Sequence, residues 1–151
     1  LELGTSLGLT TLYLAKACPK ASVITMEGSK EVAKIAEINF EKLSASNIRL
    51  INNNFDNSLK EQLKKFKEVD FVFIDGNHRE APTLSYFEKC LNYAKEDSIF
   101  IFDDIYWSRE MTSAWKQINQ HEKVTITIDC FEMGIVFFKK GQAKEHFTVY
   151  H

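Results

Sequence analysis

Residues 1–12 read Leu-Glu-Leu-Gly-Thr-Ser-Leu-Gly-Leu-Thr-Thr-Leu, and this stretch decides the fold class. A short apolar run containing one acid meets a turn of glycine, serine and threonine, and an amphipathic segment follows at once. The pattern predicts a strand, a tight turn and a helix. Gly4 and Gly8 have no Cβ, so the backbone there can adopt unusual dihedral angles and lie against a ligand. The helix would point its free N–H groups and the positive end of its dipole at the same place, which suits a cofactor with a polar or anionic end. The alternative is an ordinary strand-to-helix turn of an α/β domain.

Length and composition indicate one globular domain covering residues 1–151. Hydrophobic residues make up 44% of the chain and charged residues 26%, close to the average of globular proteins. The net charge of −2 argues against a protein that binds nucleic acid in bulk, because such proteins usually carry a basic stripe. No apolar run approaches the ~18 residues of a membrane-spanning helix. The scattered Cys18, Cys90 and Cys130 indicate reduced thiols and a cytoplasmic protein.

Apolar runs and amphipathic segments alternate along the rest of the chain. The apolar runs predict strands at 21–26, 47–51, 69–74, 98–102, 123–128 and 134–138. The segments between them predict helices at about 10–17, 29–43, 59–66, 81–94 and 108–119. This alternation predicts an α/β fold with a doubly wound, mostly parallel, seven-stranded sheet. The last two strands have no helix between them and should form an antiparallel hairpin at one edge.

The chain begins inside the first predicted strand. Only Leu1, Glu2 and Leu3 precede the turn, whereas a strand normally has ~5 residues. We therefore expect the N-terminus to be truncated, with a further segment preceding this sequence.

Polar or acidic residues follow the predicted strands, at the edge where open α/β sheets bind ligands. Glu27 ends the second strand ~20 residues beyond the glycine turn, where a carboxylate can accept both hydroxyls of a ribose. Asn54 and Phe55 follow the third strand and could contact an adenine by hydrogen bonding and stacking. The alternatives are an exposed turn acid at Glu27 and a polar turn with Phe55 in the core.

Asp75, Asp103 and Asp104 form a second group, at the ends of the fourth and fifth strands. If these strands are neighbours, the three carboxylates repel one another and their pKa values rise. A hard cation such as Mg²⁺ would relieve the repulsion, whereas in the alternative an aspartate caps the next helix and no metal binds. His78 is either a general base that works near neutral pH or an exposed loop histidine.

These motifs, in this order, resemble the class I S-adenosylmethionine-dependent methyltransferases. The resemblance is carried by the opening turn and by Thr-Met-Glu-Gly at 25–28, Asp-Phe-Val-Phe-Ile-Asp-Gly-Asn-His at 70–78 and Ile-Phe-Asp-Asp at 101–104. Within that superfamily the chain is most similar to the small-molecule O-methyltransferases of the catechol type, which depend on a cation. The resemblance covers residues 1 to about 140 and implies a Rossmann-like fold, S-adenosyl-L-methionine (SAM) as cofactor, Mg²⁺ as a candidate second cofactor, and methyl transfer to a small-molecule hydroxyl.

The resemblance also implies roles for individual residues. Those implied to bind the cofactor are Glu2, Gly4 and Ser6 at the methionine part, Glu27 and Gly28 at the ribose, Asn54 and Phe55 at the adenine, and Asp75. Asp75, Asp103 and Asp104 match the positions where the cation-dependent enzymes place Asp, Asp and Asn around Mg²⁺. His78, with Asp75, is the candidate catalytic pair, although the family has a lysine base at that position. The aspartate at 104, the histidine at 78 and the serine at 6 all depart from the family pattern.

Methyl transfer requires in-line positioning and an acceptor that is deprotonated or polarised, which a metal would favour by lowering the acceptor's pKa. The Asp- or Asn-Pro-Pro-Tyr motif of adenine and glutamine N-methyltransferases is absent after the fourth strand. Tyr106 and Trp107 directly follow the acidic pair and are the candidate substrate residues. Met111 and Trp115, one helical turn apart, are more typical of the core.

Three other interpretations remain. Residues 4–8 match the Gly-x-Ser-x-Gly elbow of α/β-hydrolases, with Ser6, Asp75 or Asp104, and His121 as a triad. A nicotinamide-dependent dehydrogenase would need a third glycine that the turn lacks. A cofactor-binding or degenerate methyltransferase domain without turnover would carry the same motifs.

The expected partner of this chain is a small-molecule methyl acceptor. A second copy of the chain, forming a homodimer, is a candidate partner. Neither bulk nucleic acid nor a membrane is expected.

Overall fold

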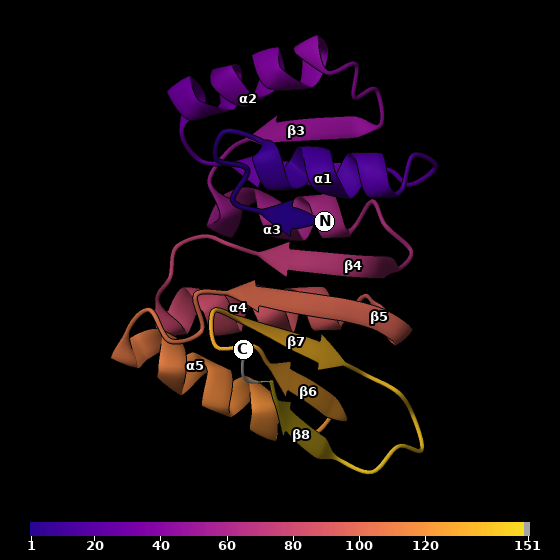
Figure 1. Cartoon of the computed structure of the whole chain (residues 1–151), viewed down its shortest axis with the longest axis vertical. Coiled ribbons are helices and arrows are strands. Elements are labelled where there is room, and N and C mark those ends of the chain that lie inside the picture. Colours follow the sequence, from indigo (N-terminus) through magenta and orange to yellow (C-terminus); the bar gives the residue numbers. More distant parts are fainter. Residues whose placement is uncertain (150–151) are drawn as a thin grey trace. The chain divides into compact units, whose positions relative to one another are not determined.

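The structure is a computed structural model that describes residues 1–149 (Figure 1). The described residues contain eight strands and five helices and divide into two compact units, Leu1–Ser58 and a second that starts at Leu59. The boundary falls inside α3 (Phe55–Leu63). That the two units fold as one domain stays a prediction.

The first unit contains a parallel three-stranded sheet with two connecting helices. Its elements are β1 (Glu2–Leu3), α1 (Leu9–Ala17), β2 (Val23–Glu27), α2 (Lys30–Lys42) and β3 (Ile48–Asn52). The strands pair in the order β3-β2-β1. Because the strands are parallel, their carboxyl ends lie at one edge, where Leu3 is level with Met26 and Glu27 with Asn52.

An apolar cluster joins α1, α2 and β3. Its buried members Leu12, Ala36 and Phe40 pack with the partly buried Ala45, Ile48 and Leu50. Gly8 precedes α1 with a φ of +82°, and a Cβ at this position would come within 2.4 Å of the Phe40 ring. The close approach of α1 to Phe40 therefore requires glycine at position 8.

The second unit contains a mixed five-stranded sheet. Its strands are β4 (Val69–Ile74), β5 (Ala94–Asp103), β6 (Ile126–Asp129), β7 (Met133–Phe137) and β8 (Glu145–Thr148). They pair in the order β4-β5-β7-β6-β8. β4 is parallel to β5, β7 is antiparallel to both β5 and β6, and β8 is parallel to β6. Figure 1 shows β4 and β5 pointing the same way and β7 the opposite way.

Two helices of the second unit, α4 (Glu80–Leu91) and α5 (Arg109–Gln120), pack against each other. The core of this unit is aromatic. The Phe87 ring meets Phe102 edge-on at 5.9 Å between centroids, and Phe102 lies 6.3 Å from Trp115. Met111 and Trp115 are both buried, so their prediction as core residues is confirmed.

The predicted α/β class, the mostly parallel pairing and the antiparallel pair of late strands are confirmed. Two details of the prediction are wrong. β8 is an additional strand, so the antiparallel pair β6–β7 is not at the edge of its sheet. The helix predicted to reach residue 94 ends at Leu91, because β5 already begins at Ala94. Within residues 1–149, no helix has the length and apolar character needed to cross a bilayer.

Candidate functional site

The turn after β1 is held by backbone hydrogen bonds to the end of β2. The N–H groups of Gly4 and Thr5 both donate to the Met26 carbonyl, over 3.0 and 3.2 Å. Gly4 and Ser6 have positive φ angles, +106° and +49°, so the chain reverses sharply before α1 begins. Ser6 is exposed at the top of this turn.

Glu27 is half-buried at the carboxyl end of β2, and both of its oxygens are held by backbone N–H groups. The N–H of Ser6 donates to Oε2 over 3.0 Å and the N–H of Ser29 to Oε1 over 2.9 Å. A carboxylate can accept about four hydrogen bonds, so each oxygen keeps one acceptor position. A Cβ on the neighbouring Gly28 would meet no atom within 4 Å, which leaves open space beside the carboxylate. Glu27 thus keeps acceptor positions toward open space, while its contact with a ribose stays a prediction.

Glu2 lies below the turn and is completely buried, with 0% exposed surface. The hydroxyls of Thr11 and Thr25 both donate to its Oε2, and the Thr5 hydroxyl lies 2.6 Å from that of Thr25. This network connects β1, the turn, α1 and β2. Glu2 therefore supports the turn from beneath, and its predicted contact with methionine stays a prediction.

The loop after β3 is fixed by asparagines whose role the sequence did not reveal. The side-chain Nδ2 of Asn52 and the backbone N–H of Asn53 both donate to the Glu27 carbonyl, over 2.9 and 3.0 Å. Asn54 Oδ1 accepts the N–H of Asp56 over 2.8 Å, so Asn54 caps the N-terminus of α3. Phe55 is half-buried as the first residue of that helix. The side-chain oxygen of Asn54 thus serves the helix, while a contact of Phe55 with adenine stays a prediction.

In the second unit, β4 and β5 are neighbours as predicted, and the chain places His78 between two of the acids that follow them. His78 Nε2 lies 3.5 Å from Asp75 Oδ1, and His78 Nδ1 lies 3.7 Å from Asp104 Oδ2. The two ring nitrogens therefore face one carboxylate each. Both distances are longer than a hydrogen bond, so the ring lies close to both acids without being locked to either.

Two acids of this group, Asp75 and Asp103, hold their protons more tightly than usual. Burial, reinforced by the neighbouring Asp103 and opposed by His78, raises the pKa of Asp75 to about 6. Burial and the charge of Asp104 also raise the pKa of Asp103. The predicted rise in pKa is confirmed at these two positions.

The residues do not fit the predicted magnesium site of Asp75, Asp103 and Asp104. Within residues 1–149, no three acid, histidine or cysteine side chains are grouped so that they could hold a metal ion. The physical reason lies in the pairing described above, because the imidazole of His78 stands between Asp75 and Asp104, where a cation would have to lie.

The backbone around this group is strained. Asn77, His78 and Asp104 have φ angles of +68°, +21° and +56°. Residues other than glycine seldom adopt such φ angles, and clusters of residues with strained backbone are typical of functional sites. A tight turn follows, closed by a 2.9 Å hydrogen bond from the Trp107 N–H to the Asp104 carbonyl.

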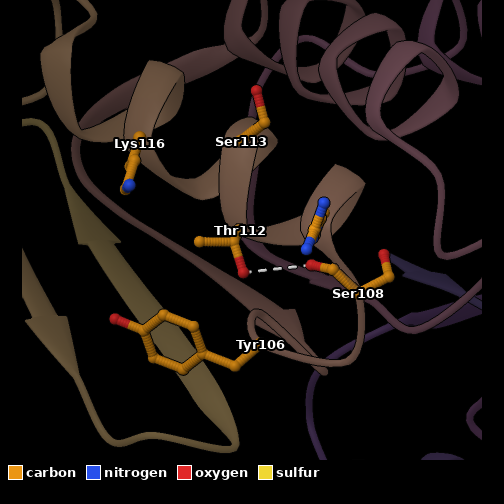
Figure 2. Close-up of a pocket in the computed structure, with 6 residues that line it drawn as sticks. Tyr106, Ser108, Thr112, Ser113 and Lys116 are labelled. Atoms are coloured by element: carbon orange, nitrogen blue, oxygen red, sulfur yellow. Dashed lines mark hydrogen bonds between the residues drawn. The ribbon is translucent and has the colours of Figure 1, made fainter.

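Beyond this turn, a pocket of about 510 Å³ lies along α5 (Figure 2). Tyr106 forms one wall, and its hydroxyl donates to the Asp129 carboxylate. The remaining lining residues are Ser108, Arg109, Thr112, Ser113 and Lys116. Trp107 does not line this pocket and is 74% exposed. The sequence predicted Tyr106 alone of these residues, although polar residues at i, i+4 and i+8 from Ser108 indicate one continuous helix face.

The geometry around His121 does not support the hydrolase interpretation. Its Nε2 lies 3.3 Å from Glu88 Oε1, and its Nδ1 accepts the backbone N–H of Lys123 over 3.2 Å. Both ring nitrogens are therefore engaged by residues other than the aspartates of the proposed triad.

Comparison with known proteins identifies the family of this chain. A family model described as a methyltransferase domain matches residues 1–105, more than half of the chain. No curated protein matches the sequence.

Solved structures match over most of the chain. An O-methyltransferase from Bacillus cereus in complex with SAH is 20% identical, with a TM-score of 0.75, over 90% of this chain and 72% of that one. The SAH-bound methyltransferase PaMTH1 from Podospora anserina is 17% identical, with a TM-score of 0.77, over 92% and 70%. The O-methyltransferase TomG from Streptomyces achromogenes, involved in tomaymycin synthesis and bound to SAM, is 16% identical, with a TM-score of 0.76, over 91% and 71%.

At these identities the solved structures show the fold, and the family model shows the family. The match to the family model over residues 1–105 shows that this chain belongs to the methyltransferase-domain family.

Proposed function

We propose that this chain is an O-methyltransferase that uses SAM to methylate a hydroxyl of a small molecule. The observation that carries the proposal is His78, whose two ring nitrogens face the carboxylates of Asp75 and Asp104 at 3.5 and 3.7 Å. The proposal is also supported by the similarity to O-methyltransferases such as those of Bacillus cereus and Streptomyces achromogenes.

Residues of the first unit would hold the cofactor. Glu27 has acceptor positions left for the two ribose hydroxyls, and Gly28 leaves space beside them. Gly4 and Ser6 would meet the methionine part with their backbone, supported from beneath by the buried Glu2. SAM, when bound, supplies a methyl group that is already activated by its sulfonium, so the protein needs only to orient the reactants and prepare the acceptor.

His78 would prepare the acceptor by acting as its general base. Imidazole exchanges a proton near neutral pH, and a positioned base typically contributes 10²–10⁴-fold to the rate. The proton leaves the acceptor hydroxyl and is held on a ring nitrogen of His78. The protonated ring then lies between the carboxyl groups of Asp75 and Asp104, at 3.5 and 3.7 Å. Asp75 and Asp104 thus flank the base and would act through it, without touching the acceptor.

The proposed reaction needs no metal ion. The imidazole of His78 performs the deprotonation that a bound metal would otherwise assist, at the position where Mg²⁺ was predicted. Turnover is therefore expected to survive EDTA. If EDTA abolishes turnover and Mg²⁺ restores it, the reaction requires a metal ion and His78 does not activate the acceptor alone.

The proposed function is tested by separating cofactor binding from turnover. Calorimetry should detect binding of S-adenosylhomocysteine (SAH). In a separate assay that contains SAM, addition of catechols or phenols should lead to formation of SAH as the second product. His78→Gln should leave SAH affinity unchanged and lower turnover at least about 100-fold. His121→Gln is the matched control, because this histidine pairs with Glu88 and should not affect turnover.

Two outcomes would contradict the proposal. Absence of SAH binding would overturn the methyltransferase function, and full turnover by His78→Gln would overturn the role of the base. SAH binding without turnover of any acceptor would instead identify a cofactor-binding domain.

We also propose a cytoplasmic location, supported by Cys18, Cys90 and Cys130, which are all free thiols.

A further inference from the structure

We infer that the pocket along α5 binds an oxyanion, a carboxylate or a phosphate, at the end of the methyl acceptor remote from its reacting hydroxyl. The inference rests on the proposed function for the identity of the ligand as the acceptor. The pocket itself is independent of that function, because its residues all belong to the second unit and have no part in holding the cofactor.

The charge of the lining is the first argument. Two cations, Arg109 and Lys116, line the pocket, together with the hydroxyl-bearing Ser108, Thr112 and Ser113 and with Tyr106. None of the lining residues among 1–149 is an acid. Neither cation forms an ion pair with any other residue in the described part of the chain. A cavity with two unpaired cations and the hydroxyls of Ser108 and Ser113 has the donors that an oxyanion requires.

The construction of the pocket is the second argument. Tyr106 is bound to Asp129, which also accepts the Trp115 indole N–H over 3.2 Å and, through its other oxygen, the Phe131 N–H over 2.9 Å. Asp129 therefore anchors the hydroxyl of Tyr106, and the Trp115 and Phe131 N–H groups hold Asp129 in turn. Thr112 donates to the Ser108 carbonyl over 3.0 Å, so the opposite wall is also ordered (Figure 2). Hydrogen bonds within the protein therefore hold both walls of the pocket.

The position of the pocket in the chain is the third argument. Tyr106 stands two residues after Asp104, in the turn closed by the hydrogen bond between Trp107 and Asp104. Asp104 in turn faces His78, the proposed base. The same turn thus connects the acidic group, where an anion would be repelled, to a cationic pocket. An acceptor with a neutral hydroxyl for the acidic group and an oxyanion for the cationic pocket matches this distribution of charge.

The test compares two probes of nearly equal shape, 3,4-dihydroxybenzoate and its neutral amide, 3,4-dihydroxybenzamide. Binding is followed by the fluorescence of Trp107, which is exposed and lies between two lining residues in sequence, with and without SAH. The carboxylate should bind at least about 10-fold more tightly than the amide, as expected for charge-assisted hydrogen bonds. If inorganic phosphate competes with 3,4-dihydroxybenzoate for the pocket, the anionic end of the acceptor is assigned as a phosphate. If inorganic phosphate does not compete, that end is assigned as a carboxylate.

Variants assign the preference to the pocket. Arg109→Gln and Lys116→Gln should each abolish most of the preference for the carboxylate and leave binding of the amide unchanged. Lys123→Gln removes an exposed cation outside the pocket and should have no effect. Equal affinity for the two probes, or an equal loss in Lys123→Gln, would overturn the inference. These results are distinguishable from failure of the proposed function, which would appear as absence of SAH binding.

Discussion

The backbone N–H of Ser6 donates a hydrogen bond to Oε2 of Glu27 over 3.0 Å, and this contact ties the glycine turn to the end of β2. The Ser29 N–H holds the other oxygen of the same carboxylate. Glutamine at position 27 offers only one acceptor oxygen, so its amide NH₂ would face an N–H donor. Glu27→Gln should therefore weaken SAH binding about 10-fold or more, measured by calorimetry. Glu37→Gln, on the exposed face of α2, is the control. Unchanged affinity in Glu27→Gln would contradict the role of this carboxylate.

Thr25 connects two buried hydrogen bonds beneath the turn. Its hydroxyl donates to Glu2 over 2.5 Å and lies 2.6 Å from the hydroxyl of Thr5. Thr25→Val keeps the shape of the side chain and removes both bonds, so the free energy of unfolding should fall by about 1–3 kcal/mol. Urea denaturation measures this loss. Thr25→Ser keeps the hydroxyl and should lose clearly less, and if serine and valine cost the same, the hydroxyl is not the cause.

The raised pKa of Asp75 should make stability fall as the pH rises. The pKa of Asp75 is about 6 in the folded protein, against an ordinary value of 3.8. Between these values the folded state binds more protons than the unfolded chain, so the free energy of unfolding decreases from about pH 4 to about pH 6 and then levels off. Asp103 contributes in the same direction, because its pKa is also raised.

Asp75→Asn should remove most of this slope, as measured by urea denaturation at several pH values. Asp97→Asn, whose carboxylate is 81% exposed, should leave the slope in place. A wild-type protein that gained stability across the same pH range would contradict the assignment.

Gly134 lies on β7 directly against the Trp115 ring. A Cβ at this position would come within 2.5 Å of the ring, which also donates through Nε1 to Asp129. Gly134→Ala should therefore displace Trp115 and destabilise the second unit by about 1–3 kcal/mol, an ordinary cost of overpacking. Thermal unfolding measures the effect. Gly28→Ala meets open space and should unfold at nearly the wild-type temperature, so equal melting of the two variants would exclude the steric cause.

Strands buried in parallel sheets could be predicted from sequence because they are continuous apolar runs. β4 has the same bounds, Val69–Ile74, in the prediction and in the structure. β8 could not be predicted, since its four residues are all exposed and pair with β6 through the backbone. The start of α3 was placed too late because three successive asparagines follow β3, and the sequence does not show that Asn54 is the one that caps the helix.

The candidate site was predictable where it depends on strand ends alone. Parallel neighbours align their carboxyl ends, so the grouping of Asp75 with Asp103 followed from the order of strands. The position of His78 did not follow, because it depends on the left-handed backbone at Asn77 and His78. The α5 pocket was missed for a different reason, since a polar helix face in a sequence is indistinguishable from one that faces only solvent.

The left-handed backbone of Asn77, His78 and Asp104 has a consequence for attempts to engineer this protein. Each such residue costs of order 1–3 kcal/mol, which the surrounding structure has to offset. Glycine would relieve the strain at any of these positions, yet at His78 and Asp104 it would also delete the base or its partner. Selection for heat resistance would thus favour changes at His78 and Asp104, to which we assign the base and its partner. A thermostable variant obtained in this way should be screened for activity at every round.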